Sequence, residues 1–418
     1  MLLDQLVQRP FCIYGAGIVA TSVYTAIKTL YRRTPLFFLI SDPEDTREKQ
    51  KQENDDLWGI DGLPVKSLSE WQCELQKKEQ QNYQKYQTRR DQKTELEQTS
   101  DSSASMVYLV AVPEVHHLSI ITALRTLQVE DENIYLFTNR RENDLMEAYY
   151  GDMANCHTVK DIISERKKQG WIDGREHSAK WPPTDGIHVY QAKSHMDKPL
   201  HDQHGLSCTP SYIFPIQVGA NLTDQIIAGL QDNIGDNISD KNRNYCELTA
   251  TYYAWKHSSA PYKGICHYRR IFDISDMKMQ ELLAVQEEWD VILPYPSVHY
   301  PDISAQHSRY VKEEDWNAMV QALEELAPEY LEAYKRSILS GERFFHNYNM
   351  LIARAPIFDD YCDFLFKILE RTEELVTPRG WERADRFAGY LGENLTTLYF
   401  LKNRERWKIA YAGKIWLT

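Results

Sequence analysis

The sequence is poor in cysteine, and its few cysteines lack any paired spacing. Seven cysteines are scattered over 418 residues, and none stands in a Cys-x-x-Cys pair. This pattern argues against the disulfide framework of a small secreted domain and offers no zinc-binding spacing. We therefore expect a reducing, cytoplasmic environment for the chain.

Long apolar runs and an excess of basic residues are also missing. No run reaches the roughly 18 apolar residues of a membrane-spanning helix, and residues 1–17 lack a basic segment followed by an apolar core. We expect neither a transmembrane helix nor a signal peptide. The net charge of −13 argues against general binding of nucleic acid, although it leaves room for a local basic pocket.

What is present predicts two α/β domains with cores of their own. Hydrophobic residues make up 42% of the chain and aromatic residues 12%, which is typical of a globular protein. Residues 165–186 are charged and are interrupted by Pro182 and Pro183, which stop any helix. We place the boundary there, with one domain at 1–178 and a second at 186–418.

The first domain opens with a strand, a glycine turn, a helix and a second strand. Phe11–Tyr14 is apolar, and the turn that follows contains Gly15, Gly17 and Ala20 in a Gly-x-Gly-x-x-Ala arrangement. Asp42 follows the second strand at the place of a ribose-binding acid. This pattern predicts a Rossmann-like, doubly wound parallel sheet. Two interpretations stay open: a nucleotide site at the helix N-terminus, or a sheet that binds no ligand.

A charged segment interrupts this domain at about residues 74–105. It consists mostly of Gln, Lys, Glu, Arg and Ser and has almost no aliphatic residues. We expect a solvated helical extension followed by a mobile loop, and we assign it no chemistry.

In the second domain, polar residues follow buried strands. The strand at 187–193 ends in Lys193, at the edge where open α/β sheets bind ligands. A polar loop then contains Asp236, Asn237, Lys241 and Asn242, which either bind a ligand or satisfy one another. The helix expected at 246–256 has the acid Glu247 on its inner side.

The stretch from Tyr262 to Phe272 carries the densest positive charge next to a strand. Gly264–Cys266 is a short apolar strand that runs into His267, Arg269 and Arg270. Guanidinium groups are costly to bury without an anion, and their planar fork fits phosphate oxygens. The stretch therefore predicts a diphosphate site; the alternative is that one arginine forms a salt bridge while the other lies in solvent.

Several uncommon motifs of the second domain, in this order, resemble the DUF4422 family. The resemblance covers roughly residues 187–400 and rests on QVGA at 217–220, GDNIS at 235–239, YCELTA at 245–250, GICHYRR at 264–270, DVILP at 290–294, NMLI at 349–352 and GENL at 392–395. It implies a GT-A-like α/β domain that acts as a glycosyltransferase on bacterial capsular or other surface polysaccharides. Its last motif more often ends Glu-Arg, so the resemblance gives Asn394 no role.

The resemblance also implies roles for particular residues. Sugar transfer with inversion needs a carboxylate base, for which the candidates are Glu393, Asp385 and Asp290; we expect Glu393 in the first turn of a helix that begins near Gly392, where the helix dipole would keep it ionised. His346 and Asn349 are expected on the acceptor side. The Asp-x-Asp motif that binds Mn²⁺ or Mg²⁺ in many such enzymes is not evident, so a divalent metal and the arginine pair are alternatives for neutralising the diphosphate.

The sequence thus predicts a transferase that moves a hexose, by family analogy galactofuranose among others, from a UDP-sugar donor to a growing, lipid-linked surface glycan. It would work in the cytoplasm, with peripheral contact to the inner face of the cell membrane; the tail from Arg404 lies on that membrane or forms a final strand at 407–411. Two rival hypotheses are an NAD-dependent or nucleotide-sugar-modifying enzyme centred on Gly15–Ala20 and a non-catalytic scaffold of polysaccharide assembly.

Overall fold

The computed structural model describes residues 2–42, 60–91, 106–154, 156–169, 184–200, 209–307, 310–377 and 383–417. The chain divides into two compact units, Met1–Glu142 and Asn143–Thr418. Residues 92–105 of the predicted insert and residues 170–183, around the predicted boundary, lie outside the described residues.

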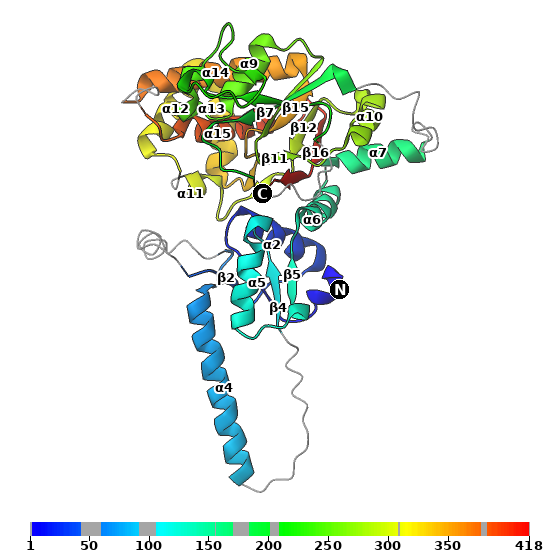
Figure 1. The fold of residues 1–418 in the computed structure, drawn as a ribbon, viewed down its shortest axis with the longest axis vertical. Coiled ribbons are helices and arrows are strands. Elements are labelled where there is room, and N and C mark those ends of the chain that lie inside the picture. The colour runs from blue at the N-terminus through cyan, green and yellow to red at the C-terminus, as the bar shows by residue number, and fades with distance from the viewer. Residues whose placement is uncertain are drawn as a thin grey trace. The chain divides into compact units, whose positions relative to one another are not determined.

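The first unit is built on a five-stranded parallel sheet (Figure 1). Its elements are α1 (Leu3–Leu6), β1 (Phe11–Tyr14), α2 (Ile18–Tyr31), β2 (Phe38–Ile40), β3 (Val65–Ser67), α4 (Leu68–Asp91), β4 (Val107–Val110), α5 (His117–Thr126) and β5 (Ile134–Leu136). The strand order is β3-β2-β1-β4-β5, and every pairing is parallel. The chain reverses direction across the sheet at β1 and β4, as in doubly wound folds. The predicted parallel α/β sheet is confirmed.

The helix α4 joins the first unit through its first turns. Trp71 is buried, its ring lies 4.6 Å from that of Phe37, and its Nε1 donates to the hydroxyl of Tyr108 at 3.0 Å. Beyond Leu75 the described side chains are exposed, and Figure 1 shows the helix as a long rod that leaves the sheet. This agrees with the predicted solvated extension, because a helix without an apolar face gains nothing by packing.

The second unit is built on a larger mixed sheet. Its elements are β6 (His157–Thr158), α7 (Val159–Lys168), β7 (Ile187–Lys193), β8 (Ile213–Gln217), β9 (Leu230–Gln231), α8 (Asn242–Tyr245), α9 (Leu248–His257), β10 (Tyr262–His267), β11 (Arg270–Phe272), α10 (Asp276–Ala284), β12 (Val291–Pro294), β13 (Ser297–Val298), α11 (Ile303–His307), α12 (Glu313–Leu326), α13 (Pro328–Arg336), β14 (Phe344–Phe345), β15 (Leu351–Arg354), α14 (Ala355–Leu375), α15 (Phe387–Asn403), β16 (Ile409–Ala412) and β17 (Lys414–Trp416). The helix α6 (Asn139–Gly151) begins in the first unit and ends in the second.

The strands of this sheet run in the order β6-β16-β12-β15-β10-β7-β8-β9, and β11 pairs with both β10 and β17. Among β7, β8, β9 and β10 every pairing is parallel, whereas β15 runs antiparallel to both β10 and β12. The helices α9 and α14 pack against the central strands over a large apolar core. The carboxyl ends of β7, β8 and β10 therefore lie at one edge, where residues 194, 218 and 268 begin the following loops.

The division between the units falls earlier than the boundary expected from Pro182 and Pro183. The strand β6 pairs in parallel with β16, and α7 contacts β16 and α10, so residues 157–168 belong to the second unit. A proline pair ends a helix, but it does not show which core the preceding helix joins.

The tail forms strands. The strand β16 pairs with β12, and β17 pairs with β11, so the residues after Trp407 complete the sheet of the second unit. Of the two alternatives for this tail, the strand is the one that the structure adopts. Among the helices of the described residues, none has the length and apolar character needed to cross a membrane.

Candidate functional site: a basic cavity at the ends of three parallel strands

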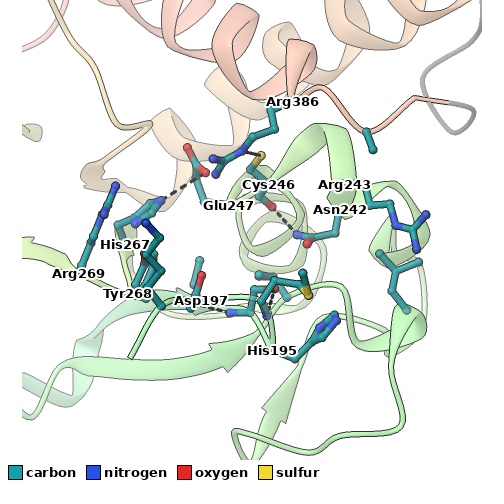
Figure 2. A pocket seen from close by; sticks show the side chains of 17 residues that line it. His195, Asp197, Asn242, Arg243, Cys246, Glu247, His267, Tyr268, Arg269 and Arg386 are labelled. Atoms are coloured by element: carbon teal, nitrogen blue, oxygen red, sulfur yellow. Dashed lines mark hydrogen bonds and ion pairs between the residues drawn. The ribbon is translucent and has the colours of Figure 1, made fainter. Parts of the chain in front are cut away.

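A cavity of about 720 Å³ lies in the second unit at the carboxyl ends of β7, β8 and β10 (Figure 2). It is lined by Ala192, Ser194, His195, Met196, Asp197, Lys198, Val218, Leu222, Asn242, Arg243, Cys246, Glu247, His267, Tyr268, Arg269, Ala384 and Arg386. A crevice beyond the carboxyl ends of parallel strands is where open α/β sheets bind ligands. The strand topology and the cavity therefore point to the same place.

Fixed positive charge predominates in the lining. Arg243, Arg269, Arg386 and Lys198 face only two carboxylates, those of Asp197 and Glu247. Three buried nitrogens of lining residues, Nε of Arg269 and Nδ1 of His195 and of His267, have no hydrogen-bond partner among the described residues. Buried donors without a partner are costly, so this side of the cavity is suited to an anion.

Glu247 is the carboxylate that lies deepest in the lining. One of its oxygens, Oε1, accepts a hydrogen bond from Nδ2 of Asn349 at 2.8 Å, and Oε2 lies 3.6 Å from Nε2 of His267. Figure 2 shows the side chains of Glu247 and His267 directed toward one another. Burial acts to raise the pKa of Glu247, but the interactions with His267 and Asn349 outweigh it and leave this pKa below its usual value. Glu247 is therefore an ionised carboxylate at the cavity.

Arg269 and Arg270, neighbours in sequence, have different surroundings. Arg269 lines the cavity, whereas the guanidinium carbon of Arg270 lies over the rings of Tyr348 and Trp416, at 4.1 and 4.3 Å from their centroids. Burial lowers the pKa of Arg270, and its Nε has no partner in the described part of the chain. Neither arginine forms a salt bridge among the described residues, whereas two other residues of this stretch do: Lys263 pairs with Asp359 and His267 with Glu247.

Glu393 lies beside Arg270, but its place in the helix and its protonation state differ from those predicted. The helix α15 begins at Phe387, so Glu393 stands in its second turn and not at its N-terminus. Its Oε1 accepts the backbone N–H of Tyr348 at 2.7 Å. Burial and the nearby charge of Glu247 raise the pKa of Glu393 to about 8, despite the opposing effect of Arg270. The expectation of a carboxylate kept ionised by the helix dipole was wrong, because the helix starts earlier than Gly392.

Strained backbone gathers around the cavity. In the second unit, all of the described residues other than glycine with positive φ are Cys246, Tyr348, Asn349 and Arg386, at +51°, +74°, +49° and +65°. Cys246 and Arg386 line the cavity, and Nε of Arg386 donates to Sγ of Cys246 at 3.2 Å. Such conformations cost roughly 1–3 kcal/mol each and persist where the surroundings fix them, often at functional sites.

The other two predicted carboxylates are not part of the lining, although Asp385 stands between the lining residues Ala384 and Arg386. Asp290 precedes β12, at the amino end of a strand parallel to β16, and its oxygens accept from Nε of Arg354 and from the backbone N–H of Lys408, both at 2.9 Å. Asp385 accepts two hydrogen bonds from Arg383, at 2.6 and 3.0 Å. Both are engaged in structural contacts, so neither is positioned as a base for chemistry in the cavity.

The polar residues of the loop after β9 mostly bond to other residues of the protein. Asp236 accepts from the hydroxyl of Tyr252 at 3.0 Å, and Asn237 bonds to the backbone of Gly235 and Ser239. Lys241 forms a 2.6 Å ion pair with Glu373. Of the four predicted residues, Asn242 alone lines the cavity, and its Nδ2 donates to the carbonyl of Cys246 at 2.7 Å.

The remaining predicted residues of this unit take different places. Lys193 stands between two lining residues, Ala192 and Ser194, but is not part of the lining. His346 is buried and stacks on Tyr411 at 5.8 Å, and burial lowers its pKa to about 4, so it is neutral. Asn349 contacts the site through Glu247.

In the first unit, the glycine turn has a clear structural role. A Cβ at Gly15, where φ is +120°, would lie 2.7 Å from the carbonyl oxygen of Ala111 and 3.3 Å from Cβ of Ala20. Gly17 precedes α2, and a Cβ added there would meet no atom within 4 Å. Asp42 accepts the backbone N–H of Ser69 in α4 at 3.0 Å. Nucleotide binding at these residues stays a prediction.

The potential metal ligands of the described residues do not form a metal site. Across the described ranges, no three His, Cys, Asp or Glu side chains gather in a way that could hold a metal ion. Arginine is the main source of positive charge at the cavity.

The comparison with family models agrees with the resemblance. The model of the family described as "Domain of unknown function (DUF4422)" matches residues 199–404. Curated proteins give no match. Among solved structures, the apo form of WbbM, a bifunctional glycosyltransferase, is 25% identical with a TM-score of 0.46, and the match covers 56% of this chain and 45% of that one. This chain thus spans less than half the length of WbbM. The second unit of this protein contains a domain of the DUF4422 family.

Proposed function

We propose that the second unit is a GT-A-like glycosyltransferase that takes a sugar from a nucleotide diphosphate donor. The observation that carries the proposal is the cavity at the ends of β7, β8 and β10, in which four fixed positive charges face the carboxyl groups of Asp197 and Glu247, and the pKa of Glu247 lies below its usual value. Arginine binds phosphate oxygens with paired hydrogen bonds, and a carboxylate can take a proton from a sugar hydroxyl. The resemblance to glycosyltransferases of surface polysaccharides agrees with both.

The proposed reaction is a direct displacement at the anomeric carbon. The acceptor hydroxyl gives its proton to Oε2 of Glu247, and the acceptor oxygen forms a bond to the anomeric carbon of the donor. The bond between that carbon and the diphosphate oxygen breaks, and the nucleoside diphosphate leaves with the electron pair. Arg269, with Arg243 and Arg386, neutralises the charge that develops on the leaving group.

The substrates follow from the family resemblance. We propose a UDP-sugar donor that carries a hexose, with galactofuranose among the candidates, and a lipid-linked, growing surface glycan as acceptor. Work at the inner face of the cell membrane is part of the same proposal. Because arginines take the place of a cation, we expect turnover to persist in the presence of EDTA.

Calorimetric titration of the whole chain with UDP tests this function. Arg269→Ala removes charge-assisted hydrogen bonds of about 1.5–3 kcal/mol and should weaken UDP binding by roughly 10- to 100-fold. The matched control is Arg406→Ala, an exposed arginine outside the lining, which should bind as the wild type does. Absence of binding by UDP and by other nucleoside diphosphates would overturn the proposal, as would equal affinities of the two variants.

A further inference from the structure

The cavity depends on a residue that lies outside its lining, Asn349. This residue lies 102 positions from Glu247 in the sequence and precedes β15, yet its side chain reaches Oε1 of Glu247. It is 1% exposed, so ligand does not reach it directly. Its side chain meets the lining of the cavity at Glu247.

The hydrogen bonds of Asn349 fix the orientation of its amide. Nδ2 donates to Oε1 of Glu247 at 2.8 Å and to the carbonyl of Gly389 at 3.1 Å, while Oδ1 accepts from the hydroxyl of Thr396 at 3.4 Å. A flipped amide would place its oxygen against a carboxylate and a carbonyl, which have no hydrogen to give. The donor side of the amide therefore faces Glu247.

The backbone at this position is bent to make the contact. Tyr348 and Asn349 both have positive φ, and Asn is the side chain besides glycine that tolerates this region best. The turn also places the backbone N–H of Tyr348 on Glu393 and its ring on Arg270. One strained turn thus contacts both carboxylates and the buried arginine.

The two oxygens of Glu247 are distinguished by this arrangement. Because Asn349 occupies Oε1, Oε2 is left facing His267 and the cavity. We propose that Asn349 is the positioning residue of Glu247: its amide holds Oε1 and leaves Oε2 as the atom that accepts the proton of the acceptor hydroxyl. This inference rests on the proposed glycosyl transfer.

A variant can remove the amide while keeping the backbone. Asn349→Gly retains a residue that adopts positive φ freely but has no hydrogen bond to offer Glu247. We expect kcat to fall by about 10- to 100-fold with the KM of the donor within twofold, since positioning and a charge-assisted hydrogen bond are lost. The control Gln128→Gly makes a matched change at a left-handed position of the first unit and should keep full activity.

The pH profile separates positioning from mere stability. Without the amide, the acid limb of kcat against pH should move to higher pH, because a hydrogen bond to the ionised form of Glu247 is gone. Other groups that interact with Glu247 are unchanged in the variant; they are His267, Arg270, Arg386, Glu393, Cys246 and Tyr361. Asn349→Asp, which places a second carboxylate on Oε1, should shift the limb further in the same direction.

The outcomes distinguish this inference from the proposed function. Suppose that the wild type transfers sugar and that Asn349→Gly has the kcat of the wild type and the same acid limb. This result overturns the inference and leaves the proposed function unaffected. A loss of kcat equal at every pH, accompanied by a lower unfolding temperature, also overturns it. If the wild type turns over no donor, the proposed function is wrong. The pKa of Glu247 can then still be measured by ¹³C NMR of the glutamate carboxyls, with the signal assigned from Glu247→Gln. A pKa that is the same in Asn349→Gly and in the wild type would overturn the inference.

Discussion

At the scale of single residues, Glu247 and Glu393 are two carboxyl groups whose surroundings push their pKa values apart. Glu247 has a histidine and an amide to stabilise its charge, whereas Glu393 is buried with a backbone N–H and lies near the charge of Glu247. Two like charges in one buried site are not both favoured, so one group stays protonated. At neutral pH the ionised member is the one that lines the cavity.

This difference predicts that the free energy of unfolding decreases as the pH rises into the alkaline range. The pKa of Glu393 is raised to about 8 in the folded chain, so the folded state holds a proton that the unfolded state has lost. Its stabilising contribution is complete below the unfolded pKa and is lost as pH rises through about 8. Glu393→Gln, which stays neutral, should therefore be more stable than the wild type at pH 9 by about 1 to 4 kcal/mol.

Urea unfolding at pH 6 and pH 9 measures this effect. The stability advantage of Glu393→Gln over the wild type should be about 1–3 kcal/mol smaller at pH 6 than at pH 9, because the unfolded wild type is already ionised at pH 6 whereas the folded chain loses its proton only near pH 8. Glu324→Gln, at an exposed position of α12, is the control and should show no such divergence. The same gap between Glu393→Gln and the wild type at both pH values would contradict the prediction.

At the scale of elements, the short strand β17 completes the surroundings of Arg270. β11 pairs with β17, which places the guanidinium of Arg270 over the ring of Trp416, and the turn before β15 adds the ring of Tyr348, which packs edge-on against Trp416 at 5.6 Å. Contacts with two rings restrict the direction of the guanidinium, which forms no salt bridge among the described residues. Three segments distant in sequence thus hold one arginine beside Glu393.

Trp416→Ala should loosen this arginine. Loss of one partly buried cation–π contact, about 0.5–2 kcal/mol, predicts a fall in kcat/KM of roughly 2- to 30-fold in a donor turnover assay. Trp416→Phe keeps an aromatic face and serves as the matched control, with a smaller loss. Equal activity of Trp416→Ala and the wild type would show that Arg270 needs no support from β17.

At the scale of the whole molecule, the chain offers two places where a nucleotide could bind. One is the cavity of the second unit, and the other is the glycine turn between β1 and α2 in the first. Hydrogen exchange of the full chain with and without UDP separates them. We expect protection at residues 194–198 and 268–270 and none at residues 15–20, because a bound ligand slows opening of the segments it contacts.

Other patterns of protection would favour one of the two rival hypotheses. Protection confined to residues 15–20 would favour the rival enzyme centred on the first unit, and the same titration with NAD then serves as its test. If neither UDP, NAD nor any other nucleoside diphosphate changes hydrogen exchange in either unit, the result would favour the scaffold hypothesis.

Much of the fold could be read from local pattern. Apolar runs of strand length bounded by turns predicted β1, β4, β7 and β10, and the alternation with helices predicted a parallel sheet. The start of α15 was missed because Phe387 follows Arg386, a residue with positive φ and no capping side chain. No standard start signal marks that helix.

The site was predicted only in part, for a physical reason. Local pattern was enough to predict guanidinium groups at the end of a buried strand, because apolar runs and charges are local properties. Arg269 does line the cavity. Which carboxylate joins it was decided by the tertiary structure alone. Strand direction puts Asp290 at the amino end of β12, whereas His267 and the amide of Asn349, which comes from a distant turn, lower the pKa of Glu247. Such pairings depend on where strands and turns meet in space, which no local pattern records.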